Sequence, residues 1–91
     1  MTTDTKGPRI SDLDSVAVGE TPTARLTESV LRGVCTRDGV GVQEALTVVA
    51  GHTLSDEWTV YRWLRGHRSP GSRTLRALSN LASDVGVEVA A

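Results

Sequence analysis

The sequence lacks phenylalanine, and it has a single cysteine, Cys35, among its 91 residues. One cysteine excludes an internal disulfide framework and a multi-cysteine zinc site, and it fits a reducing setting. No apolar run approaches the roughly 20 residues that a membrane-spanning helix needs, and the first residues have no signal-peptide core. We therefore expect one small cytoplasmic domain without a membrane contact, and a second subunit would add to its limited core.

Acidic residues are missing from a long segment of the chain. Between Trp58 and Ser83 there is no aspartate or glutamate, and the segment has a formal charge of +5. Its basic residues are Arg62, Arg65, Arg68, Arg73 and Arg76. Because the whole chain has a charge of −1, the remainder must have about −6 (−1 minus +5). This asymmetry predicts a basic face, although an ordinary solvated surface also gives such a pattern.

Helical spacing of apolar residues predicts an all-α chain with four helices, at about 22–36, 42–50, 56–66 and 72–84. Thr21 and Pro22 are typical of a helix start, and Gly51 is expected to end the second helix. The expected core consists of Leu26, Val30, Val34, Leu46, Val49, Ala50, Val60, Trp63, Leu64, Leu75, Leu78, Leu81 and Ala82. Leu54 is expected to point inward, and residues 87–89 alternate as in a short strand or a frayed tail.

The first twenty residues show no sustained hydrophobic period. They contain scattered single apolar residues among Thr, Asp, Ser, Gly and Lys. This composition predicts a mobile tail over residues 1–20, followed by one helical domain over residues 21–91. A weaker alternative is a short turn around Ile10 and Leu13 that docks on a neighbour.

The segment Ser55–Pro70 predicts a short helix with a cap at each end. Ser55 or Asp56 can accept a backbone N–H at its start, and Gly66 fits the left-handed position after its last turn. One side of this helix is apolar and consists of Val60, Trp63 and Leu64. The opposite side has Trp58, Arg62 and Arg65. A helix that buries one face and exposes arginines beside an indole is typical of a DNA-recognition helix.

From Val42 to Val87 the chain resembles the helix-turn-helix domain of phage Cro and lambda-type repressor proteins. The resemblance depends on Gln43-Glu44, Leu46, Gly51, Thr59-Val60, Arg62-Trp63, Arg65-Gly66, Arg68, Pro70, Leu75 and Leu78. Its most specific part is the W-x-x-G-x-x-x-P run at Trp63, Gly66 and Pro70. The string Tyr61-Arg62-Trp63-Leu64 also resembles the winged-helix excisionase and MerR-type groups.

The Cro and lambda-repressor resemblance implies a lambda-repressor-like fold of four to five helices and a role for individual residues. In such domains the third helix enters the major groove and the second lies across the DNA backbone. The positions that match base-contacting residues are Glu57, Trp58 and Arg62. The positions that match phosphate-contacting residues are Gln43, Arg65, Arg68 and Arg73. Alternatively, Arg62 pairs with Glu57, and Trp58 stacks on a sugar, contacts a thymine methyl group or covers a dimer seam.

The function that this resemblance implies is sequence-specific DNA binding by a transcription regulator, a repressor of the phage, plasmid or antitoxin type. Such a protein acts in a bacterial or phage setting and binds double-stranded DNA as a homodimer. A helical module that binds a partner protein through Trp58 and Tyr61 is the alternative. The acidic pair Asp56 and Glu57 and the near-neutral net charge favour that alternative. Because no nucleophile–base set, metal-ligand spacing or phosphate loop is present, we expect neither enzymatic activity nor a metal or cofactor.

Overall fold

The computed structural model describes residues 8–10 and 12–87. Over these residues the chain forms a 3₁₀ helix and four α-helices, and no strand. The elements are η1 (Leu13–Ser15), α1 (Pro22–Asp38), α2 (Val42–His52), α3 (Glu57–Arg65) and α4 (Ser72–Asp84). The all-α prediction is therefore confirmed. The predicted strand or frayed tail lies mostly outside the described residues, which end at Val87.

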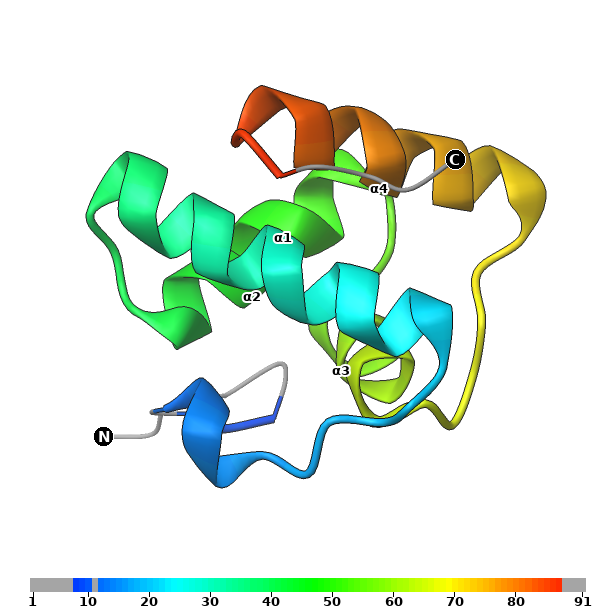
Figure 1. Cartoon of the computed structure of the whole chain (residues 1–91), viewed down its shortest axis with the longest axis horizontal. Coiled ribbons are helices and arrows are strands. Elements are labelled where there is room, and N and C mark those ends of the chain that lie inside the picture. Colours follow the sequence, from blue (N-terminus) through cyan, green and yellow to red (C-terminus); the bar gives the residue numbers. More distant parts are fainter. Residues whose placement is uncertain (1–7, 11, 88–91) are drawn as a thin grey trace.

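Helix α1 is the centre of the arrangement. It packs against α2, α3 and α4, and Figure 1 shows it crossing the middle of the molecule with α4 above it and α3 below it. Among the described residues no helix is both long enough and apolar enough to span a membrane. Because α3 packs on α1 and α2, one of its faces is buried and the other is left for solvent.

The core consists of the apolar faces of all four α-helices. Trp63 is its largest buried side chain, with 2% of its surface exposed, and Leu31, Leu46, Leu64 and Leu78 are buried with it. Each such leucine contributes roughly 1.5–3 kcal/mol by leaving water. The predicted core is confirmed except for Leu26 and Leu75, which are only partly buried. The burial of Leu31 was not predicted, because the expected apolar stripe on α1 consisted only of every fourth residue, Leu26, Val30 and Val34.

Two helix ends differ from the prediction. Helix α1 starts as expected, since the Thr21 hydroxyl accepts from the backbone N–H of Ala24 at 3.1 Å, but it ends at Asp38, where Gly39 adopts a φ of 65°. Helix α2 does not end at Gly51. It continues to His52, because Gly51 is helical, and the left-handed residue of the following turn is Leu54, with a φ of 57°.

The described residues 8–10 and 12–20, which we call the N-terminal strap, do not form the predicted mobile tail. They match the alternative, a short turn around Ile10 and Leu13 that packs on its neighbours. Ile10 and Leu13 are buried in the core, with 4% and 3% of their surfaces exposed. Asp12 caps η1 by accepting from the N–H of Asp14 at 3.1 Å. The tail prediction also covers residues 1–7 and 11, which lie outside the described residues. Figure 1 shows the strap along the lower edge of the molecule, beside α3.

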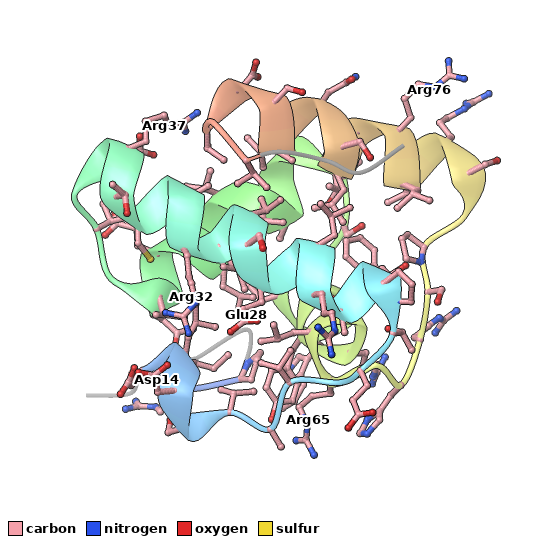
Figure 2. All side chains as sticks on the ribbon, in the orientation of Figure 1. Asp14, Glu28, Arg32, Arg37, Arg65 and Arg76 are labelled. Atoms are coloured by element: carbon pink, nitrogen blue, oxygen red, sulfur yellow. The ribbon has the colours of Figure 1, made fainter. Side chains whose placement is uncertain are left out.

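The strap is attached to both α1 and α3. The guanidinium of Arg32 donates to Asp14 at 2.8 Å and to Glu28 at 3.1 Å (Figure 2), although exposed ion pairs of this kind add little stability. The N–H of Gly19 donates to the carbonyl of Leu64 at 2.9 Å. The strap therefore crosses the C-terminal end of α3 and holds that end in place.

Candidate nucleic-acid interface

Helix α3 has the two caps that its sequence predicts. The Asp56 carboxylate accepts from the N–H of Thr59 at 2.7 Å, and the residue itself has an extended backbone. Gly66 adopts a φ of 77°, and its N–H donates to the carbonyl of Trp63 at 3.0 Å. Between the caps, Val60 and Leu64 are completely buried. The helix is thus fixed at both ends and along its inner face.

The outer face of α3 has an ordered row of side chains. Trp58 has 46% of its surface exposed, and its ring meets that of Tyr61 edge to face, with 5.9 Å between the centroids. The guanidinium of Arg65 donates to the Tyr61 hydroxyl at 3.0 Å and lies 5.8 Å from the centre of the Tyr61 ring. Arg62 is exposed. Tyr61, which is itself bonded to Arg65, therefore supports the indole of Trp58.

The arginines of the acid-free segment have no carboxylate partner within the described part of the chain. Ion pairs there involve Arg32 and Arg37 of α1, which bind carboxylates of Asp14, Glu28 and Asp38. Arg62 does not form an ion pair with Glu57, so that alternative is wrong. The exposed arginines of the segment are therefore available to an external anion; they are Arg62, Arg68, Arg73 and Arg76.

The predicted basic face is divided in this structure, because four of the five arginines form two separate clusters. One lies on α3, with Arg62 and Arg65, and the other on α4, where Arg73, Arg76 and Ser72 line a hollow of about 210 Å³. In Figure 2 Arg65 lies at the lower edge of the molecule and Arg76 at the upper edge. Arg68 is exposed in the loop between α3 and α4. The predicted phosphate contact Arg73 thus belongs with Arg76, and not with the outer face of α3.

Gln43 does not have the free side chain that a phosphate contact requires. Its amide nitrogen donates to the carbonyl of Pro8 at 2.8 Å, and its amide oxygen accepts from the N–H of Ile10 at 2.8 Å. Because Pro8 and Ile10 are buried, the backbone groups of the strap need partners, and Gln43 supplies them. The predicted phosphate role of Gln43 is therefore replaced in this structure by attachment of the strap to the first turn of α2.

The remaining predicted residues differ in their accessibility. Arg65 is half-buried against Tyr61, and its Nε atom is buried without a hydrogen-bond partner. It is therefore less free to contact a phosphate than predicted. Glu57 is also half-buried, in the first turn of α3. Of the predicted contacts on α3, Trp58 and Arg62 are the exposed ones.

Sequence reasoning missed Leu54, which was expected to point inward. This side chain has 94% of its surface exposed, and its φ of 57° is unusual for a leucine. It lies in the turn between α2 and α3, two residues before the cap Asp56. No local pattern distinguishes it from a leucine that points inward, because a turn residue has no helical period to follow.

The cap of α3 predicts a specific pH dependence of stability. The hydrogen bond from the backbone N–H of Thr59 lowers the pKa of Asp56, and the positive charge of Arg62 adds to this effect. Since the pKa is lower in the folded protein than in the unfolded chain, the cap stabilises above about pH 4 and loses this effect as the pH falls further. Asp56→Asn keeps an uncharged cap. The difference in thermal midpoint between wild type and Asp56→Asn should therefore shrink from pH 5 to pH 2. A constant difference would contradict this assignment.

Other chemistry-bearing residues are scattered. Burial raises the pKa of the half-buried Cys35 thiol, which disfavours the nucleophilic thiolate. Within residues 8–10 and 12–87 no three His, Cys, Asp or Glu side chains lie close enough together to hold a metal ion. Searches of protein-family models, of curated proteins and of solved structures found no match to this chain.

Proposed function

We propose that this protein binds double-stranded DNA in a sequence-specific manner and regulates transcription, with the outer face of α3 in the major groove. The observation that supports this proposal most directly is the state of Arg62. It is exposed, it has no carboxylate partner among the described residues, and it lies one helical turn from the exposed Trp58. An arginine that projects from a rigid helix suits a bidentate contact to guanine.

The connection between α2 and α3 also favours DNA binding. The two helices contact each other and are joined only by residues 53–56. This is the element order of a helix-turn-helix, in agreement with the resemblance to Cro and lambda-type repressors. We accordingly propose a repressor of the phage, plasmid or antitoxin type. One such unit contacts few base pairs, so we propose that it binds a palindromic site as a homodimer.

Selection of bound duplexes from a random pool, followed by fluorescence anisotropy, tests the proposal. We expect one preferred palindromic sequence, with an affinity that falls steeply as salt increases, because bound phosphates release counterions. An affinity independent of salt, or a pool with no preferred sequence, would contradict it. The alternative, a protein-binding module that would use the exposed Trp58, predicts little salt dependence.

Arg62→Ala should lower the affinity for the selected duplex by about 5- to 150-fold, which corresponds to 1–3 kcal/mol, and should relax the preference at one base pair. The matched control is Arg37→Ala, because Arg37 pairs with Asp38 at the far end of α1. This control should leave binding within twofold. Equal losses in both variants would show that a general loss of charge, and not a base contact, governs affinity.

The arginine clusters should differ in the salt dependence of binding. If Arg68 contacts one phosphate, Arg68→Ala reduces the slope of log affinity against log salt by about 0.9. The same measurement on Arg73→Ala determines whether the α4 cluster also contacts the backbone. An unchanged slope for Arg68→Ala would exclude this residue from the phosphate contacts.

A further inference from the structure

Two large hydrophobic side chains are exposed among the described residues, one in the turn that precedes α3 and one in the first turn of α3. They are Leu54, with 94% of its surface exposed, and Trp58, with 46%. Leu54 adds no burial to the core, and its left-handed backbone is a conformation that leucine disfavours. Folding therefore does not explain why a leucine occupies this position. A strained and exposed apolar residue points instead to an intermolecular contact.

We propose that Trp58 and Leu54 contact the 5-methyl groups of thymines in the major groove, so that the bound site contains thymine. This inference rests on the proposed DNA binding. Thymine is the base that presents an apolar group in the major groove, and apolar side chains are its ordinary partners. The two side chains flank the cap Asp56, whose carboxylate is already engaged by the N–H of Thr59.

The support of the indole is the second reason. The edge of one ring meets the face of the other at 90° between Trp58 and Tyr61, and the Tyr61 hydroxyl accepts from Arg65 at 3.0 Å. The contact with Tyr61 therefore restricts the indole before any ligand arrives, which reduces the entropy lost on binding. Tyr61 is a positioning residue in this arrangement, since it acts through Trp58.

Charge and size favour DNA over a protein or a second copy of the chain as the occupant. Arg62, one turn beyond Trp58, has no carboxylate partner among the described residues, which suits a phosphate-rich neighbour. Two exposed apolar side chains make too small a patch for the apolar core of a stable protein interface, which buries about 800 Å² on each side. Their size matches a contact with one or two methyl groups.

The test compares the selected duplex with copies in which single thymines are replaced by deoxyuridine, a change that removes only the methyl group. For the wild-type protein we expect about a fourfold loss of affinity at each contacted thymine. Trp58→Ala should bind the thymine and uracil duplexes equally at the one thymine that Trp58 contacts. Leu54→Asn should do so at a different thymine, the one that Leu54 contacts. Because asparagine tolerates the left-handed conformation, Leu54→Asn should unfold at a higher temperature than wild type. Arg37→Ala should keep the full uracil effect.

Several results would overturn the inference and leave the proposed function intact. They are a selected site without thymine, wild-type affinities within twofold on every uracil copy, or a uracil effect that persists in both variants. A lower oligomeric state of Leu54→Asn, with no uracil effect in the wild type, would place the two side chains between copies of the chain and would equally overturn it. If no duplex is bound in a salt-dependent manner, the proposed function itself fails.

Discussion

Trp63→Ala should destabilise the fold by about 3–5 kcal/mol, the usual cost of removing a buried aromatic side chain. Trp63 has 2% of its surface exposed and belongs to the core cluster between the helices. Since small domains are stable by only about 5–15 kcal/mol, this one substitution should remove a large part of the free energy of unfolding. Urea unfolding followed by circular dichroism measures the loss.

Trp58→Ala is the matched control, because it is the same substitution on the same helix. Trp58 is half-exposed, and its main described contact is the aromatic pair with Tyr61. Its loss should cost about 0.5–1.5 kcal/mol of stability, while the affinity for the selected duplex falls. Equal destabilisation by the two variants would contradict the assignment of one tryptophan to the core and the other to the interface.

Gly19→Ala should destabilise the protein by about 1–3 kcal/mol through overpacking. A Cβ atom at this position would lie 2.6 Å from the carbonyl oxygen of Arg65 and 2.7 Å from the Cα of Gly66. Both are backbone atoms, so no side-chain rotation relieves the clash, and the strap has to move away from the end of α3. We expect the thermal midpoint to fall by about 4–8 °C for each kcal/mol.

Gly51→Ala adds the same methyl group and should have the opposite effect. Gly51 is within α2, and a Cβ atom there would meet no other atom within 4 Å. Alanine in a helix is favoured over glycine by roughly 0.5–1 kcal/mol, so this variant should be more stable than wild type. By contrast, a Gly19→Ala variant as stable as wild type would contradict the close contact between the strap and the end of α3.

The helices were predictable because their signals are local. The apolar face of Val60, Trp63 and Leu64, together with Asp56 and Gly66 as caps, placed α3 within one residue of its observed bounds, Glu57–Arg65. The predicted end of α2 at Gly51 was wrong, because a glycine permits a left-handed backbone without requiring one. The left-handed residue is Leu54, and nothing in its sequence neighbourhood indicates this.

The strap and the arginine clusters were not predictable because they depend on contacts between distant residues. Ile10 and Gln43 are 33 positions apart, and their hydrogen bond is what removes Gln43 from the predicted phosphate contacts. A 3₁₀ helix of three residues is too short to show a period. The five arginines are close in sequence, but the loop after Gly66 directs α4 away from α3 and separates Arg76 from Arg65 (Figure 2).

Amide chemical-shift mapping tests most directly whether the outer face of α3 meets a DNA duplex. The ¹⁵N-labelled protein is titrated with the selected duplex, and the shift of each backbone amide is recorded. We predict the largest changes over residues 54–62, and small changes at the C-terminal end of α1, near Arg37. Large changes near Arg37 with an unperturbed α3 would contradict the claim.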